Sequence, residues 1–243
     1  MTFIDKIKNK QADLSGNRQV TIAFLGDSVT HGCFELGYHD VHGAITIHDL
    51  DFVYHNRVRQ IMHMLYPTVP FTFVNAGIGG ESAPMGEKRL ERDVISYRPD
   101  LTVVCFGLND SGNGKKRVDE YINALRSIFI RLRESGSAVI FMTPNVRGER
   151  VNERIINEKA RELATEMCTP ELTETMDLYM DKARELCSEL DVPVCDCYDL
   201  WKKMSKAGVD VTSLLSNDIN HPTRDMHYLF AIELVKVMLG GKV

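Results

Sequence analysis

Short apolar runs alternate with longer amphipathic stretches along the chain. The short runs are rich in β-branched and apolar side chains, which is typical of strands covered on both faces. They lie at residues 20–25, 71–75, 101–106, 138–143 and 192–195. The longer stretches carry apolar positions at helical spacing, and they lie at 3–14, 51–66, 85–97, 118–135, 151–190 (with an expected break at 169–170) and about 224–239. This alternation predicts an α/β fold with a parallel sheet and right-handed crossovers.

One segment departs from this alternation. Residues 31–55 are rich in His, Asp and Tyr and show no sustained periodicity until about residue 51. Long loops inside compact domains usually have a function, so we expect a loop that covers the site. The length of 243 residues fits one domain, 1–243, and we expect an active-site insert at about 33–54.

Composition narrows the classes of partner. Lys and Arg number 29 against 34 Asp and Glu, a formal charge of −5, and the basic residues are scattered among acidic ones, which disfavours nucleic acid. The N-terminal stretch is charged and does not resemble a secretory signal, and no apolar run approaches membrane-spanning length. The six cysteines are irregularly spaced, which indicates free thiols. We therefore expect a cytoplasmic protein with neither a nucleic-acid nor a membrane partner.

Residues suited to acyl transfer follow three of the predicted strands. Ser28 comes directly after the first strand, where Gly26 lets the backbone turn and free N–H groups can bind an anion. Taken alone, Ser28 would be better explained as a helix N-cap. Gly80 and Asn109 follow the second and third strands. Because the carboxyl ends of parallel strands meet at one edge of a sheet, we expect these three residues to converge.

A serine nucleophile needs a base, a group that orients the base, and donors for the developing oxyanion. The candidate base is His221, and the carboxylate of Asp218, three residues earlier, is placed to accept its Nδ1–H. The oxyanion donors are the backbone N–H groups of Ser28 and Gly80 and the side-chain amide of Asn109.

Four short blocks carry a family resemblance. They are GDS at 26–28, NxGxxG at 75–80, GxND at 107–110 and DxxHP at 218–222. With these blocks in this order the chain resembles the SGNH, or GDSL, hydrolases. The resemblance implies a flavodoxin-like three-layer α/β/α sandwich with a five-stranded parallel sheet, and it implies no cofactor and no metal. It also implies the roles of five residues: nucleophile Ser28, oxyanion donors Gly80 and Asn109, base His221 and orienting acid Asp218.

The expected activity is that of a serine esterase that removes a short acyl group, acetyl in the first instance, from a carbohydrate. The polar insert suits hydroxylated ligands, and no long apolar lid for a fatty chain is evident. A lysophospholipase or an acyl thioesterase is the alternative enzyme. A carbohydrate-binding module on an inactive hydrolase scaffold is the alternative from another class.

Side chains outside the four blocks are expected to select the substrate. The insert histidines match no common metal-ligand spacing, so we interpret them as part of the substrate pocket. The residues expected to line or cover that pocket are Tyr38, His39, Asp40, His42, His48 and Tyr54. Asn145 and Arg147, just after the fourth strand, are also expected at the rim.

Overall fold

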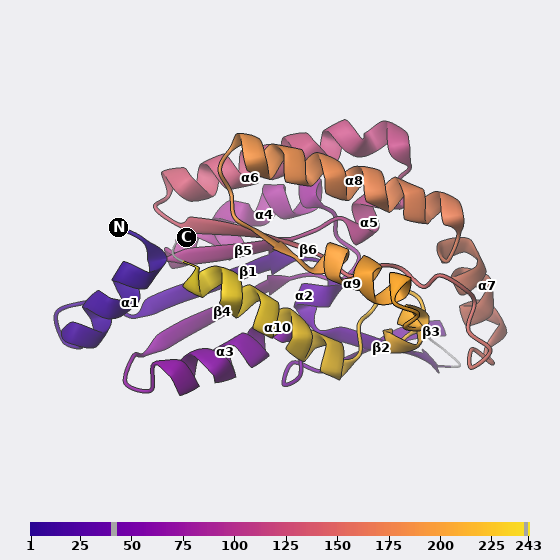
Figure 1. Cartoon of the computed structure of the whole chain (residues 1–243), viewed down its shortest axis with the longest axis horizontal. Coiled ribbons are helices and arrows are strands. Elements are labelled where there is room, and N and C mark those ends of the chain that lie inside the picture. Colours follow the sequence, from indigo (N-terminus) through magenta and orange to yellow (C-terminus); the bar gives the residue numbers. More distant parts are fainter. Residues whose placement is uncertain (40–42, 241–242) are drawn as a thin grey trace.

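A five-stranded parallel sheet forms the centre of the protein, of which the computed structural model describes residues 1–39, 43–240 and 243 (Figure 1). The strands are β1 (Val20–Gly26), β4 (Phe71–Gly77), β5 (Leu101–Cys105), β6 (Ala138–Thr143) and β7 (Val194–Asp196). Their order is β4-β1-β5-β6-β7, and all neighbours are parallel. The predicted α/β fold is confirmed.

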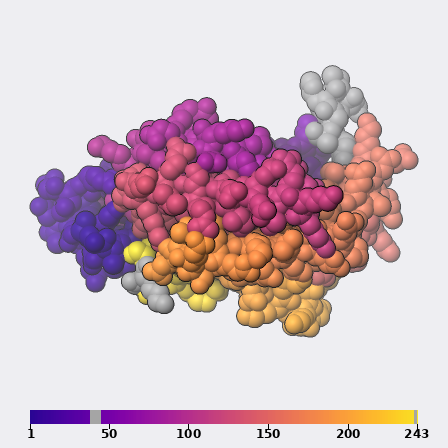
Figure 2. All heavy atoms as spheres, turned by 90° about the horizontal axis from the view of Figure 1, so that it is seen from above, coloured from indigo at the N-terminus to yellow at the C-terminus, as the bar shows by residue number. Residues whose placement is uncertain are grey.

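Helices cover both faces of the sheet. One face carries α4 (Ala83–Asp93), α6 (Val118–Glu134) and α8 (Pro170–Glu189), and the view from above shows α6 and α8 side by side (Figure 2). The other face carries α1 (Phe3–Ala12), α3 (Tyr54–Leu65) and α10 (Arg224–Leu239) (Figure 1). The remaining helices are α2 (Ser28–His31), α5 (Leu108–Ser111), α7 (Glu158–Met167), α9 (Cys197–Lys206), η1 (Ile95–Tyr97), η2 (Lys115–Arg117) and η3 (Val211–Leu214).

The core follows from the apolar pattern. All seven residues of β1 are buried, as expected of a central strand between two helical layers. On α6 the buried positions recur at helical spacing and face the sheet, and Gly136 follows the helix with a positive φ of 86°. No described helix combines the length and the apolar character that crossing a bilayer requires.

The expectation of a long loop at 31–55 is wrong. After α2 the chain forms an antiparallel hairpin of β2 (Cys33–His39) and β3 (Gly43–His48), separate from the main sheet. Most of the side chains described on it are at least partly exposed, so neither face produces a continuous apolar pattern that sequence periodicity could reveal. The helix expected from residue 151 begins only at Glu158, and Asn157 caps it. The hairpin and α7 lie at the same end of the sheet (Figure 1).

Candidate active site

Ser28 is the first residue of α2, at the carboxyl end of β1. The Asp27 side chain caps this short helix by accepting the Val29 N–H at 3.0 Å. Gly26 has no positive φ, so its expected role as a turn residue is wrong. A Cβ at Gly26 would lie 2.1 Å from Thr30 Oγ1, and this position is therefore glycine because α2 packs against the strand end.

His221 lies next to Ser28. Its Nε2 is 3.1 Å from Ser28 Oγ, and its Nδ1 is 2.9 Å from the backbone carbonyl oxygen of Phe34. A carbonyl can only accept a hydrogen bond, so Nδ1 carries the proton and Nε2 is free to accept the Ser28 hydroxyl. Burial lowers the pKa of His221 below its ordinary value. The imidazole is thus neutral at neutral pH, as a general base must be.

Asp218 does not contact the His221 ring in this arrangement. Its Oδ1 accepts hydrogen bonds from Asn152 Nδ2 at 2.9 Å and from Arg154 Nη2 at 2.5 Å. The backbone of Asp218 is left-handed, with a φ of 58°. The structure therefore brings Ser28 and His221 together but gives the Asp218 carboxylate partners from a different segment of the chain.

Two asparagines shape the turn that carries His221, and sequence reasoning assigned one of them, Asn217, no role in the site. Asn217 Oδ1 accepts the backbone N–H groups of Ile219, Asn220 and His221 at 2.9–3.1 Å. Asn145 is fully buried, and its Nδ2 donates to the Asn220 carbonyl at 2.8 Å. The expectation that Asn145 lies at the rim is wrong, because its side chain is buried and contacts the turn from inside the protein. Asparagine is common in turns, and this preference could have identified Asn217 from the sequence.

The predicted oxyanion donors face the same cavity as Ser28 and His221. This cavity of about 470 Å³ is lined by Ser28, Gly80, Asn109 and His221, among others. Within the described chain, the N–H groups of Ser28 and Gly80 have no hydrogen-bond partner, so both are free to bind an oxyanion. Gly80 has a φ of 80°, a conformation that favours glycine. Asn109 donates one amide hydrogen to the Glu81 carbonyl at 2.8 Å and keeps a second hydrogen.

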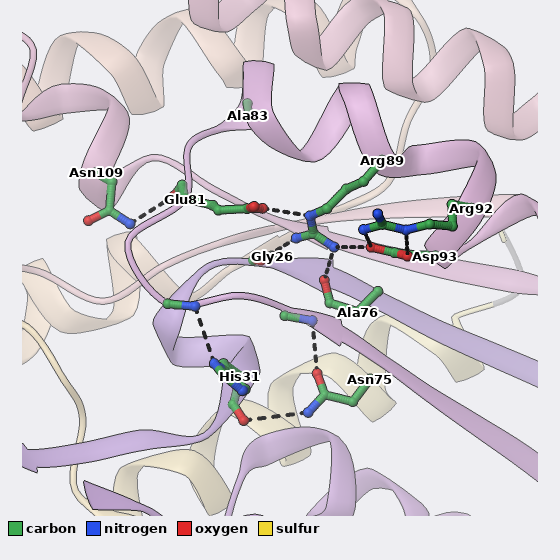
Figure 3. A network of polar contacts seen from close by, with 12 residues as sticks. Gly26, His31, Asn75, Ala76, Glu81, Ala83, Arg89, Arg92, Asp93 and Asn109 are labelled. Carbon is green, nitrogen blue, oxygen red and sulfur yellow. Dashed lines mark hydrogen bonds and ion pairs between the residues drawn. The ribbon is translucent and has the colours of Figure 1, made fainter. Parts of the chain in front are cut away.

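Arg89 joins the segments that carry these donors, and sequence reasoning did not identify it (Figure 3). Its guanidinium donates to the carbonyls of Gly26 at 3.1 Å and Ala76 at 2.7 Å, at the ends of β1 and β4. It also donates to Glu81 Oε2 at 2.5 Å. Because Asn109 binds the Glu81 carbonyl, one buried arginine links all three loops of the oxyanion region (Figure 3).

Two buried carboxyls, those of Asp27 and Asp110, interact with each other, and Asp27 directly precedes Ser28 in the chain. Burial raises the pKa of Asp27 to about 7 and that of Asp110 to about 6, and the charge of Asp110 adds to the rise at Asp27. Arg147, whose charge opposes the rise at Asp27, is 3% exposed and donates to the Leu108 carbonyl. The expectation that Arg147 lies at the substrate rim is wrong, because its side chain is buried inside the protein.

The insert contributes to the cavity only in part. His48 lines it, whereas Tyr54 is buried in the core and its hydroxyl contacts Thr30 Oγ1 at 3.0 Å. The side chains of Tyr38, His39, Asp40 and His42 lie outside the described residues.

One group of possible metal ligands lies in the same cavity. The ligand atoms of His31, Cys33 and His48 are within 4.8 Å of one another. However, His31 Nδ1 accepts the Gly79 N–H at 3.2 Å, so the neutral ring carries its proton on Nε2 (Figure 3). Burial also raises the pKa of the Cys33 thiol to about 11. In this arrangement the His31 Nδ1 lone pair is already occupied and the Cys33 thiol carries its proton, so the group would have to rearrange and lose that proton to hold a metal ion.

Apolar side chains form much of the cavity wall. They come from the hairpin, from α7 and from the loops that carry Gly80 and His221, and they are Leu36, Ile78, Leu163, Met167 and Ile219. A second cavity of about 390 Å³ shares Gly80 and Asn109 with the first, and most of its other lining residues are polar or charged. The oxyanion region therefore lies between an apolar and a polar depression.

Comparison with known proteins identifies the family. The profile of the GDSL-like lipase/acylhydrolase family matches residues 24–229. The chain belongs to this family. The family consists of carboxylic ester hydrolases, so an ester is the class of substrate expected here. The resemblance inferred from the four sequence blocks is confirmed.

Relatives with known names are distant. The acetylxylan esterase of Geobacillus stearothermophilus is 30% identical over 132 residues, which cover 51% of this chain and 58% of that protein. An uncharacterized lipoprotein of Bacillus subtilis is 27% identical over 201 residues, covering 76% of this chain and 80% of the relative.

Solved structures share the fold. A catalytic mutant of Axe2, an acetylxylan esterase from Geobacillus stearothermophilus, superimposes with a TM-score of 0.67 at 22% identity, covering 92% of this chain and 96% of the other. The five-stranded sandwich predicted from the resemblance is thereby confirmed. Catalytic mutants of Axe2 have been solved in which a serine, an aspartate or a histidine is replaced by alanine. That aspartate precedes that histidine by three positions, the same separation as Asp218 and His221.

Proposed function

We propose that this protein is a serine esterase that removes acetyl groups from a carbohydrate, with Ser28 as nucleophile and His221 as base. The observation that carries the proposal is the 3.1 Å contact between Ser28 Oγ and His221 Nε2 in a cavity that also presents Gly80 and Asn109.

The mechanism follows from this contact. His221 Nε2 takes the hydroxyl proton as Ser28 Oγ attacks the ester carbonyl. The N–H groups of Ser28 and Gly80 and the amide of Asn109 bind the oxyanion of the tetrahedral intermediate. His221 then protonates the departing alcohol. Water, activated by the same histidine, attacks the acyl-enzyme and releases the acid and free Ser28.

The choice of substrate is supported by two observations. The relative from Geobacillus stearothermophilus, matched in sequence and in structure, is named an acetylxylan esterase. The polar cavity beside the oxyanion region offers Lys88, Asn113 and Glu120 to a hydroxylated alcohol group. We therefore assign the sugar to the polar cavity and the acetyl group to the side of Ser28.

The apolar wall of the larger cavity favours a second candidate, an esterase for longer acyl chains such as a lysophospholipase or a thioesterase. Leu163 and Met167 of α7 face this cavity together with Leu36 of the hairpin. A cavity of about 470 Å³ has more room than an acetyl group needs. Rates on p-nitrophenyl esters of two to ten carbons separate the candidates, since an optimum beyond four carbons contradicts the acetyl assignment.

Replacing Ser28 tests the assignment of the nucleophile. We expect Ser28→Ala to lose at least about 10⁴ in kcat on p-nitrophenyl acetate, because no other group supplies the attacking oxygen. Ser15→Ala, in an exposed turn far from the cavity, is the matched control. A Ser28→Ala protein that folds and keeps its turnover would remove Ser28 from the mechanism.

Covalent labelling distinguishes the esterase from a carbohydrate-binding module on the same scaffold. A fluorophosphonate should modify Ser28 in the native protein and leave Ser28→Ala unlabelled. A well-folded native sample that binds xylo-oligosaccharides but resists the label would favour the binding module.

A further inference from the structure

We propose that His31 is a positioning residue of the oxyanion site, because its ring holds the loop whose Gly80 N–H binds the developing charge. The inference rests on the proposed function, since it concerns the transition state of that reaction. It assigns a role to a side chain that lines the cavity but lies outside the four sequence blocks.

Residues 78–80 form an exposed loop directly after β4. The last pair between β1 and β4 is Gly26 with Gly77, and all three residues of the loop are exposed, so packing does not hold them. Gly79 and Gly80 are consecutive glycines, and glycine has the widest choice of φ and ψ. The direction of the Gly80 N–H therefore depends on hydrogen bonds that fix the peptide groups around it.

His31 binds the peptide group that precedes this donor. Its Nδ1 accepts the Gly79 N–H at 3.2 Å, which is the only hydrogen bond of that N–H within the described chain (Figure 3). On the other side of Gly80, the Asn109 amide donates to the Glu81 carbonyl at 2.8 Å. The two bonds fix the loop before and after Gly80, while the Gly80 N–H itself stays free for the substrate.

The position of His31 is fixed by the contact between α2 and the end of β4. His31 is the last residue of α2, the helix that begins with Ser28. The two backbones touch, since a Cβ at Gly77 would lie 2.3 Å from the His31 backbone nitrogen. The Asn75 side chain spans this contact by donating to the His31 carbonyl at 3.5 Å and accepting the Gly77 N–H at 2.9 Å (Figure 3). One short helix therefore carries both the nucleophile and the anchor of the oxyanion loop.

The surroundings of the His31 ring keep it neutral, as an acceptor must be. Burial and the charges of His48 of β3 and Arg89 of α4 lower its pKa. The His48 ring lies 4.6 Å away, centroid to centroid. The thiol of Cys33 on β2, within 4.8 Å of a His31 ring nitrogen, has its pKa raised to about 11 and keeps its proton. At neutral pH the Nδ1 lone pair is thus available to the Gly79 N–H.

Two substitutions separate the hydrogen bond of His31 from the space that its ring fills. His31→Leu has no acceptor, and we expect kcat on p-nitrophenyl acetate to fall about tenfold to a hundredfold with KM within about threefold of native. His31→Asn places an amide oxygen close to the position of Nδ1, so it should recover most of that loss. His63→Leu, at a half-buried histidine of α3 outside the cavity, is the control. Equal losses in His31→Leu and His31→Asn would overturn the proposal.

A backbone substitution tests whether His31 acts through the Gly79 N–H. Replacing Gly79 by glycolic acid exchanges this N–H for an ester oxygen and keeps every side chain. We expect the same fall in kcat as in His31→Leu and no further fall when the two changes are combined, because both remove one hydrogen bond. The same exchange at Gly16, whose N–H donates to Asp13 in an exposed turn, is the control. Losses that multiply in the combined variant would contradict the proposal.

Labelling by a fluorophosphonate reports on the oxyanion site without turnover, because its phosphoryl oxygen occupies that site. We expect the labelling rate of His31→Leu to fall by about the same factor as kcat, while its melting temperature stays close to native. A His31→Leu protein that labels and turns over at the native rate overturns the role of His31 and leaves the serine mechanism standing. A native protein that neither labels nor hydrolyses esters overturns the proposed function itself.

Discussion

Ser28 and His221, the proposed catalytic pair, are supported by the fold in different ways. The nucleophile side, defined by the loops at 26–32, 75–81 and 107–111, grows directly from the ends of three neighbouring strands of the central sheet. The base side, defined by the hairpin at 33–48 and the turn at 215–223, lies outside that sheet and is joined by side chains from distant segments. The sheet therefore fixes the position of Ser28, the proposed nucleophile. Contacts outside the sheet fix the orientation of His221, the proposed base.

The largest effect that tests this comparison is expected on the nucleophile side. Asn109→Ala removes one oxyanion donor and should lower kcat about 10²–10³-fold with a smaller change in KM. Steady-state kinetics on p-nitrophenyl acetate measure it. Asn113→Ala, which alters a side chain of the neighbouring polar cavity, is the control and should stay near the native kcat on this small substrate. An unchanged rate in Asn109→Ala would remove Asn109 from the site.

Arg89 tests whether the nucleophile side is part of the stable core. Arg89→Met leaves the carbonyls of Gly26 and Ala76 and the carboxylate of Glu81 without their donor. Because the guanidinium is only 6% exposed, we expect a loss of about 3 kcal/mol in the free energy of unfolding, measured by urea denaturation. Arg92→Met, whose charge lies in solvent, should leave the unfolding midpoint nearly unchanged. Similar midpoints for the two variants would mean that the loops do not depend on the core.

A smaller and different effect is expected on the base side. Arg224→Gln frees the hairpin from Glu35 and Asp49 and should lower kcat roughly tenfold, because the base loses its fixed alignment. The melting temperature should change little, since the guanidinium is partly exposed. Lys236→Gln, at an exposed ion pair on the same helix, is the control. A large fall in melting temperature without loss of kcat would reverse the distinction between the two sides.

Sequence reasoning predicted the placement of residues that directly follow the ends of strands. The positions of Ser28, Gly80 and Asn109 after three strands predicted their convergence, since parallel strands leave little freedom there. It failed where a contact depends on the direction in which one side chain points. The spacing of Asp218 and His221 suggested a contact, but a left-handed residue at 218 and an arginine 64 positions earlier turn the carboxylate elsewhere. A local sequence pattern cannot indicate that a backbone carbonyl will accept the hydrogen bond of a distant histidine. The hairpin that supplies Phe34 also shows no strand periodicity in its sequence.

The hairpin also has a consequence for how the enzyme can diversify. Its Phe34 carbonyl meets the base, while Leu36, Thr46 and His48 of the same two strands line the cavity. A change of hairpin that admits a new acyl group would therefore also change the alignment of His221. Loop grafting between relatives should yield many inactive chimeras unless Arg224 and its two carboxylate partners are transferred together with the graft.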